Sequence, residues 1–217
     1  MRQRLSFAFL IVALVFGVAV SDARALQSND PSSLISSLVD EAIGVIKDPQ
    51  IASTDREKRF RSLLEAGFDI PRIARFVLGR YWASASDQDR QRFSSLFEDW
   101  IVRTYAARFT SYSGQTIKVT GTRSESEIST VVQSQFTSPD NPNPAKIDWR
   151  VRKESDGSYK IVDVSVEGIS MALTQRDEIS TVADRAGGTV EGLNNALQQR
   201  IASGELAPGA VPAESQK

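Results

Sequence analysis

The sequence predicts an α+β protein built from one curved sheet of four antiparallel strands and about six helices. Four segments between residues 116 and 166 alternate apolar and polar side chains, which is the pattern of half-buried strands. Turn and loop residues separate these segments, so the strands should form a meander. Apolar residues at helical spacing come before and after this region. Helices and strands that are grouped in this way are typical of the α+β class.

The first 25 residues have the features of a secretory signal peptide. Arg2 and Arg4 give a positive start, residues 5–20 are apolar, and Ala23-Arg24-Ala25 forms a small-x-small cleavage site. A membrane anchor is the alternative, but the apolar run is shorter than the ~20 residues that usually span a bilayer. We therefore expect cleavage after Ala25 and export of the mature chain. A lipid anchor is excluded because no cysteine is present.

Charge and composition exclude several classes of function. Cleavage would remove three arginines and one aspartate from the 26 basic and 27 acidic side chains, which leaves a mature net charge of −3. Nucleic-acid binding would require clustered positive charge. The chain has no cysteine and no histidine, so thiolate chemistry, serine–histidine pairs and the usual zinc ligands are absent. Carboxylate chemistry remains open, but no acidic pair stands out, and we expect neither an enzyme nor a cofactor.

Two amphipathic helices are predicted at the start of the mature chain. Pro31 opens a helix that runs to about Lys47, and Pro49 lies just beyond its end. The run Thr54-Asp55-Arg56-Glu57 has the form of a capping box and predicts a second helix that ends at Gly67. The apolar stripe of the first helix consists of Leu34, Leu38, Ala42, Val45 and Ile46.

A short, strongly apolar helix is predicted next. Asp69 can cap it, Pro71 suits its first turn and Gly79 suits its end. Large apolar side chains occupy most of its girth, and Tyr81 and Trp82 follow it, each with a polar group on its ring. Burial in a core is the ordinary interpretation of such a helix, and the wall of an apolar cavity is the alternative.

A long helix with an aromatic face is predicted from Ser86, its cap, to about Thr110. Five of the seven side chains on its apolar stripe are aromatic. Because side chains normally fill a protein interior, such a face is more often packed core than ligand wall, and both interpretations stay open. The stripe contains Phe93, Leu96, Phe97, Trp100, Ile101, Tyr105 and Phe109.

The four predicted strands are joined by distinct turns. Ser124-Glu125-Ser126 should connect the first two strands and Glu154-Ser155-Asp156-Gly157 the last two, with Gly157 at positive φ. Residues 137–145 contain three prolines, and they are predicted as a loop that cannot be strand. The strands are residues 116–122, 127–136, 146–153 and 158–166, with Val162, Val164 and Val166 on one face of the last.

The third predicted strand is charged on one side. Ile147, Trp149 and Val151 alternate with charged residues, so the apolar set should face the interior and the charged set solvent. Solvation is the ordinary role of such a face, and docking to membrane-bound partners is the alternative. The basic side chains available for docking are Arg150, Arg152, Lys153 and Lys160.

Two helices follow the strands. Gly168 ends the last strand, helical spacing begins near Ser170, and Gly187-Gly188 separates the two helices. Residues 203–217 are rich in Ala, Pro, Gly and Ser, so we expect a disordered tail and a folded domain over residues 26–202. The apolar positions of the two helices are Leu173, Ile179, Val182 and Ala183, then Val190, Leu193, Leu197 and Ile201.

Several short motifs stand in a fixed order between Phe68 and Arg176. They are Phe68-Asp69-Ile70-Pro71-Arg72-Ile73-Ala74-Arg75, Val77-Leu78-Gly79-Arg80-Tyr81-Trp82, Thr104-Tyr105-Ala106, Tyr112-Ser113-Gly114, Val162-Asp163-Val164-Ser165-Val166-Glu167-Gly168-Ile169-Ser170 and Gln175-Arg176. Together they resemble the MlaC family of periplasmic lipid-binding proteins, also called toluene-tolerance auxiliary transport proteins. The likeness extends from about residue 31 to residue 202. Each motif alone is modest, but the ordered set is specific.

The resemblance implies a fold of the nuclear-transport-factor type, in which a curved sheet and helices enclose an apolar cavity. It implies a soluble periplasmic carrier that takes phospholipid between an outer-membrane lipoprotein–porin complex and an inner-membrane ABC transporter complex. We expect the mature chain to be a monomer, because its only long apolar run is removed with the signal peptide. Such a carrier contributes to the lipid asymmetry of the outer membrane. A related branch of the family is associated with hopanoid lipids, so the resemblance leaves the ligand open between the two lipid classes.

The residues expected to line the cavity are large apolar side chains of these helices and strands. A periplasmic protein-interaction module with a filled core is the second hypothesis for function, and a carboxylate-dependent hydrolase is the third. The expected ligand-binding residues are Phe76, Tyr81, Trp82, Phe97, Trp100, Ile101, Tyr105, Val132, Trp149, Val151, Val164, Val166 and Ile169.

Overall fold

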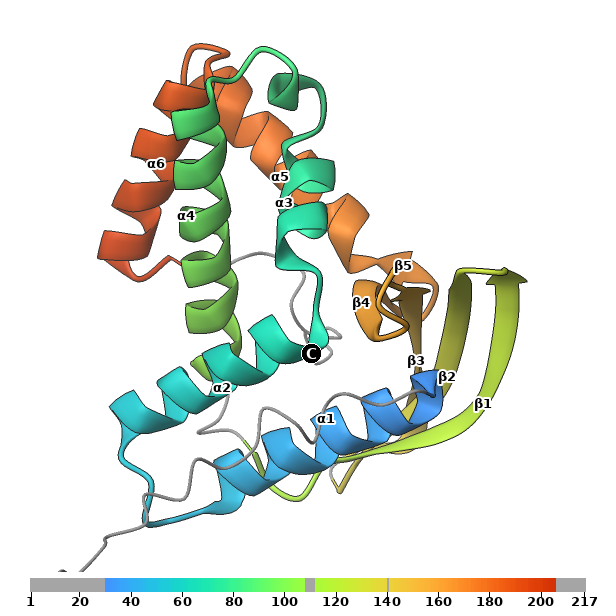
Figure 1. The fold of residues 1–217 in the computed structure, drawn as a ribbon. Helices are drawn as coiled ribbons and strands as arrows, with labels where there is room; N and C mark the ends of the chain where they lie inside the picture. The colour runs from blue at the N-terminus through green and yellow to red at the C-terminus, as the bar shows by residue number, and fades with distance from the viewer. Residues whose placement is uncertain (1–29, 108–111, 140, 206–217) are drawn as a thin grey trace, which may run out of the picture.

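The computed structural model describes residues 30–107, 112–139 and 141–205 (Figure 1). The predicted signal peptide, Phe109 and the tail beyond Glu205 lie outside these residues. The helices are α1 (Pro31–Lys47), α2 (Ser53–Gly67), α3 (Ile70–Leu78), the 3₁₀ helix η1 (Gly79–Trp82), α4 (Asp87–Ala106), α5 (Met171–Arg185) and α6 (Val190–Ser203). The strands are β1 (Thr116–Ser126), β2 (Ser129–Ser138), β3 (Asn141–Lys153), β4 (Tyr159–Val166) and β5 (Ile169–Ser170).

The predicted α+β class is confirmed, with six α-helices and a curved, open antiparallel sheet in the order β1-β2-β3-β4-β5. The short strand β5 was not predicted. Glu167 (φ 50°) and Gly168 (φ 81°) form the two-residue turn that leads into it, and positive φ at both positions is typical of a tight hairpin. Glu167 is held there because its N–H donates to the Lys146 carbonyl at 2.9 Å and its carboxylate accepts the Lys146 N–H.

Helix caps were predicted well where they depend on adjacent residues. The side chains of Asp69 and Ser86 accept the N–H groups of Arg72 and Asp89, as expected. The capping box at Thr54 is wrong. Helix α2 begins at Ser53, because the Asp55 and Arg56 N–H groups already donate to the Ala52 carbonyl, which places Thr54 inside the first turn. The caps of the remaining α-helices are Asp30, Ser170 and Thr189.

The turn between β1 and β2 lies later than predicted. Strand β1 continues through Ser126, which pairs with Ser129, so the turn consists of Glu127 and Ile128. Glu125 cannot serve as a turn residue because its carboxylate is held within the sheet by Arg150 (Nε to Oε2, 2.9 Å). The partner of this charged strand residue thus lies two strands away in the sheet.

The segment predicted as a proline loop is largely strand. Strand β3 begins at Asn141 and pairs with β2, contrary to the prediction that residues 137–145 cannot be strand. Pro142 and Pro144 are tolerated because β4 ends opposite Ile147. On that side β3 extends past its neighbour, where a missing N–H removes no ladder hydrogen bond.

A bulge in β4 changes which of its side chains face inward. Arg150 pairs with Asp163 and Val151 with Ile161, so Val162 is the extra residue. Val164 still pairs with Trp149 on the inner face, but the inward residue at the other end is the fully buried Ile161. The predicted set Val162, Val164 and Val166 is therefore wrong at Val162.

The described residues form two hydrophobic cores. Helices α3 to α6 stand together at one end and enclose the helical core, and α1, α2 and the sheet enclose the sheet core (Figure 1). The helical core contains Ala74, Val77, Leu78, Tyr81, Phe93, Phe97, Trp100, Ile179, Val182, Ala183, Val190, Leu193 and Leu197. The sheet core contains Leu34, Ile35, Leu38, Val39, Leu63, Val132, Ile147, Trp149, Val151 and Ile161.

Candidate functional site

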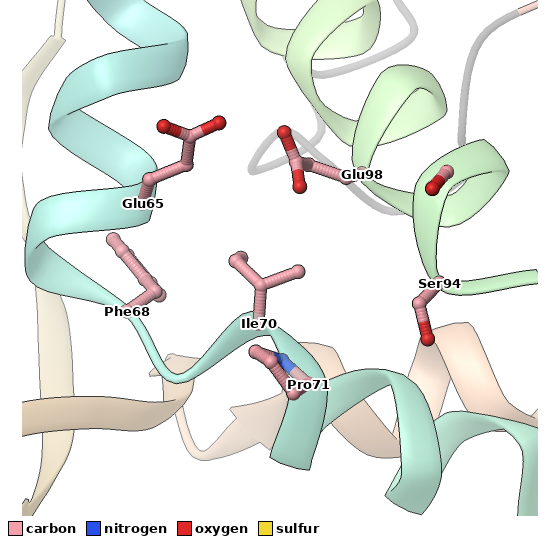
Figure 2. Close-up of a pocket in the computed structure, with 7 residues that line it drawn as sticks. Glu65, Phe68, Ile70, Pro71, Ser94 and Glu98 are labelled. Atoms are coloured by element: carbon pink, nitrogen blue, oxygen red, sulfur yellow. The ribbon is translucent and has the colours of Figure 1, made fainter. Parts of the chain in front are cut away.

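A cavity of about 300 Å³ lies where α2, the start of α3 and α4 meet (Figure 2). Phe68, which packs against the sheet core, contributes to one wall, and Ile70 and Pro71 at the start of α3 contribute to another. The cavity therefore lies at the junction between the two cores. Its lining residues are Glu65, Phe68, Ile70, Pro71, Ser94, Ser95 and Glu98.

The rim of this cavity is charged. Figure 2 shows the carboxyl groups of Glu65 and Glu98 facing each other. Burial raises the pKa of the Glu65 carboxyl above its usual range, and the nearby Glu98 carboxylate raises it further. Arg61 joins α2 to α4, since its Nη1 lies 2.6 Å from Glu98 Oε1 and its Nη2 lies 2.7 Å from Asp99 Oδ1. The cavity thus has an apolar floor and a polar rim.

The link between α2 and α3 is attached to the sheet. Phe68 forms a parallel bridge with Ile161, and the Asp69 N–H donates to the Ile161 carbonyl at 3.0 Å. Lys160 Nζ donates to the carbonyls of Glu65 (3.0 Å) and Ala66 (2.5 Å) at the end of α2. These bonds hold one wall of the cavity against β4.

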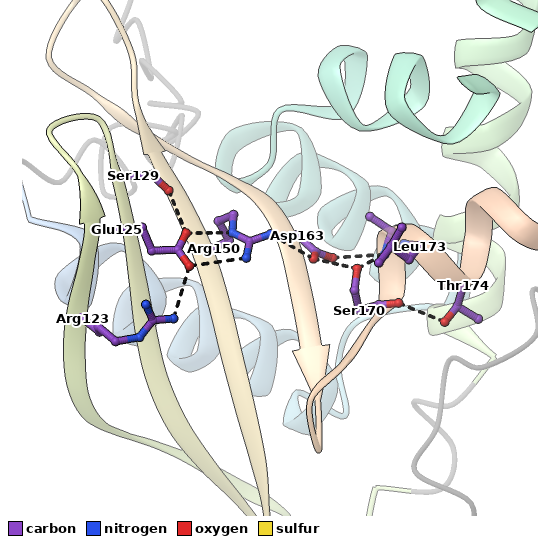
Figure 3. Close-up of polar contacts among 9 residues, drawn as sticks. Arg123, Glu125, Ser129, Arg150, Asp163, Ser170, Leu173 and Thr174 are labelled. Carbon is purple, nitrogen blue, oxygen red and sulfur yellow. Dashed lines mark hydrogen bonds and ion pairs between the residues drawn. The ribbon is translucent and has the colours of Figure 1, made fainter. Parts of the chain in front are cut away.

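Asp163, on β4, attaches the start of α5 to the sheet (Figure 3). It is only 9% exposed, its Oδ1 accepts the Ala172 N–H at 3.1 Å, and its Oδ2 accepts the Ser170 hydroxyl at 2.7 Å. A carboxylate at the start of a helix satisfies free N–H groups and complements the helix dipole. The sequence contained a signal for this role, since Asp163 interrupts an apolar strand seven residues before a capping serine.

Arg150, on the charged face of β3, makes several contacts within the sheet. Arg150 pairs with Glu125 and lies 3.7 Å from Asp163, and the Glu125 carboxylate also accepts from Arg123 and Ser129 (Figure 3). Hydrogen bonding to Arg150 lowers the pKa of Glu125. Arg150 and Lys160 therefore have partners within the fold, and Lys153 is exposed. The docking role considered for Arg150, Arg152, Lys153 and Lys160 stays a prediction.

The structure divides the expected ligand-binding residues between the two cores. Three of them belong to neither core: Phe76, which is 40% exposed, Ile169, which is 62% exposed, and Tyr105. The Tyr105 ring centre lies 6.5 Å from that of Phe60. Tyr81, Trp82, Phe97, Trp100 and Ile101 belong to the helical core or pack against it. Val132, Trp149, Val151, Val164 and Val166 belong to the sheet core or pack against it.

The polar groups of the buried aromatic residues have partners. Trp100 Nε1 donates to the Glu205 carbonyl at 3.1 Å, and Trp149 Nε1 donates to the Ser134 hydroxyl at 2.9 Å. The Tyr81 hydroxyl donates to the Asp184 carboxylate. These rings are therefore oriented by the protein and present apolar surface without an unsatisfied donor.

Sequence reasoning missed the residues that line the cavity itself. Phe68 is in the link between α2 and α3, where a polar turn is the usual expectation, and Ile70 and Pro71 are the first residues of α3. The large apolar side chains of Phe68 and Ile70, on either side of the capping Asp69, are the signal that could have identified a buried junction.

Two further findings concern the part of the chain that the structure describes. Every helix there is too short or too polar to cross a bilayer. No three Asp, Glu, His or Cys side chains are grouped there as a metal site would require.

Comparison with known proteins gives consistent matches. A family model described as MlaC protein matches residues 36–199. The intermembrane phospholipid transport system binding protein MlaC of Haemophilus influenzae is 27% identical over 97 residues, which are 44% of this chain and 45% of that protein, so the match spans about half of this relative. A phospholipid-binding protein from Ralstonia solanacearum, solved in complex with a phospholipid, has the same fold with a TM-score of 0.71. That match covers 81% of this chain and 98% of the other at 24% identity. Since the family model matches most of the sequence, the chain belongs to the MlaC family.

Proposed function

We propose that this protein is a carrier that holds the acyl chains of a phospholipid between its two cores and moves the lipid through an aqueous compartment. The observation that carries the proposal is the cavity at the junction of the cores, in a chain of the MlaC family. Moving one methylene group from water into an apolar environment lowers the free energy by about 0.8 kcal/mol. A lipid with roughly thirty methylene groups therefore faces a barrier on the order of 20 kcal/mol if it crosses water without a carrier.

The size of the cavity implies a change of shape on loading. About 300 Å³ is at the lower end of the range of small-molecule pockets, roughly 300–1,000 Å³, and a lipid with two chains needs more room. We propose that the two cores separate at the cavity and expose their inner faces to the acyl chains. The proposed lining is Phe68 and Ile70 with Tyr81, Trp82, Phe97, Trp100, Ile101, Tyr105, Val132, Trp149, Val151, Val164 and Val166. Phe76 and Ile169 are left out because they are exposed on the outside.

The head group is proposed to stay in water at the charged rim. Burying a phosphate without a partner would be costly. The apolar floor at Phe68, Ile70 and Pro71 suits the acyl chains.

The place of action is proposed from the names of the relatives and the N-terminal sequence. The Haemophilus relative is named for intermembrane phospholipid transport, and residues 1–25 have the composition of a signal peptide. We infer a periplasmic, monomeric, non-enzymatic carrier that exchanges lipid with an outer-membrane complex and an inner-membrane ABC transporter complex.

Mass spectrometry of lipid extracted from the purified mature protein, starting at Leu26, tests the proposal. Phospholipid at a fixed ratio to protein is the expected result. A hopanoid would keep the carrier but change its cargo. Protein that stays free of lipid after purification and after incubation with phospholipid vesicles would favour the interaction module instead.

A further inference from the structure

Three of the four exposed large apolar side chains in the described residues lie on α3, on β5 and at the start of α5, which directly follows β5. Phe76 is 40% exposed, Ile169 62% and Leu173 51%. Leu173 and Arg176 are three residues apart on α5 and share a helix face, and Arg176 Cζ lies 5.2 Å from the centre of the Phe76 ring. Clustered apolar side chains that face solvent indicate an interaction surface.

Arginines accompany this apolar surface. Arg176 lies on the Phe76 ring, and Arg75 Cζ lies 5.8 Å from the Trp82 ring. Within the described residues neither guanidinium has a carboxylate within 4.0 Å. We call Arg75, Phe76, Ile169, Leu173 and Arg176 the α3–α5 face.

The other charged groups near this face are mostly paired with one another. Asp69 binds Arg72 at 2.6 Å, and Asp184 binds Arg80 at 2.8 Å. Asp177 follows Arg176 on α5 and is exposed. Glu167, two residues before Ile169, is also exposed, and its carboxylate accepts the Lys146 N–H. The guanidiniums of Arg75 and Arg176, which lie on aromatic rings, favour an anionic surface.

We propose that the α3–α5 face docks on the surface of a bilayer that contains anionic phospholipid. Phe, Leu and Ile side chains can enter the head-group region while arginines remain at the level of the phosphates. In a symmetric contact with a second copy of this chain, Arg75 and Arg176 would lie close to the same two arginines of the other copy, and the like charges would repel. This inference rests on the proposed function, because a carrier of phospholipid must collect and release its cargo at a membrane.

Docking in this way brings the cavity close to the bilayer. Ile70 and Pro71 line the cavity at one end of α3, and Arg75 and Phe76 lie one turn further along the same helix. A helix of nine residues is only about 14 Å long. An acyl chain that leaves the bilayer beneath this face has a short path through water.

Sedimentation with lipid vesicles tests the docking. The mature protein should bind vesicles of phosphatidylcholine with phosphatidylglycerol, bind phosphatidylcholine alone much more weakly, and lose affinity as salt rises. The double variant Leu173→Asn/Arg176→Gln should bind the anionic vesicles at least about tenfold more weakly. The matched control is Ile128→Asn/Arg59→Gln, which changes an apolar residue that is 44% exposed and an exposed arginine elsewhere, and it should bind like the parent.

Lipid content and thermal unfolding, measured on the same samples, separate this inference from the proposed function. The double variant should keep its bound lipid and its unfolding temperature. If it unfolds, Ile169→Asn replaces it as the test, since that side chain is the most exposed of the three. A parent protein that carries lipid but ignores anionic vesicles would overturn the docking and leave the carrier function standing. Equal weakening by the control pair would also overturn it.

Discussion

A single buried carboxylate, Asp163, connects the sheet to the start of α5. We expect Asp163→Ala to lower the free energy of unfolding by about 1–3 kcal/mol, because the Ala172 N–H and the Ser170 hydroxyl lose their acceptor. Urea unfolding measures the change. Asp40→Ala, an exposed carboxylate on α1, is the control and should change stability by less than about 0.5 kcal/mol. A loss as small as that of the control would show that Asp163 does not position α5.

The Glu65 carboxyl makes the rim of the cavity sensitive to pH. Its pKa is raised in the folded protein, so the folded state binds a proton more readily than the unfolded state. Stability contributed by this group therefore falls as pH rises from the ordinary value of 4.5 through the raised pKa. Glu65→Gln should remove this dependence. Relative to the parent protein, the variant should therefore be more stable at neutral pH than it is near pH 4.5.

Denaturant unfolding at a series of pH values measures the effect. Glu57→Gln on the same helix is the control and should follow the parent protein throughout. A parallel pH dependence in Glu65→Gln and parent would contradict the assigned pKa shift.

At the scale of elements, the α2–α4 contact is the one that must loosen if the cores separate. Arg61→Gln removes the bonds to Glu98 and Asp99. Partly exposed ion pairs of this kind are worth about 0.2–1 kcal/mol, so global stability should change little. Transfer of fluorescent phospholipid to acceptor vesicles should become faster by a factor of up to about five.

The control for this contact is an arginine that joins two elements of the helical core. Arg92 Nη2 lies 2.9 Å from Asn195 Oδ1, and this bond links α4 to α6. Arg92→Gln should leave the transfer rate unchanged. An equal increase of the transfer rate in both variants would mean that any loosened helix contact speeds transfer, and that the α2–α4 contact has no special role.

The elements that sequence reasoning predicted correctly are those whose causes are local. Asp69 and Ser86 cap helices through N–H groups three residues away, and the helical apolar spacing gave α1, α3, α5 and α6 nearly to the residue. The errors have distant causes. Pro144 is compatible with strand only because β4 ends opposite Ile147, and Ile161 faces inward only because β4 contains a bulge.

At the scale of the whole molecule, the proposed loading requires the two cores to move apart. The chain has no cysteine, so two introduced thiols can be joined selectively. Joining Glu65→Cys and Glu98→Cys with a short thiol cross-linker should stop lipid transfer, because these residues face each other across the cavity (Figure 2). Cross-linking Arg92→Cys to Asn195→Cys within the helical half should leave transfer intact.

The candidate site was less predictable than the fold because it depends on contacts between residues that are far apart in sequence. The sequence identified apolar faces such as those of Trp100 and Trp149, and these side chains are buried as expected for either core or wall. Which core each face belongs to depends on how α2 and α3 are joined to β4, through bonds such as that from Asp69 to Ile161. Such long-range contacts leave no periodic signal in the sequence.

The division into two cores also has a consequence for how the chain folds. The helical core combines residues 74–100 with residues 179–197, and all the strands lie between them in sequence. Helices α3 and α4 are synthesised first. Helices α5 and α6, which cover their apolar faces, are synthesised only after all the strands. Closing so long a loop raises the contact order and slows folding. A chain that has not yet reached α5 therefore keeps Phe93 and Trp100 uncovered, and it stays unfolded at that end until its last helices arrive.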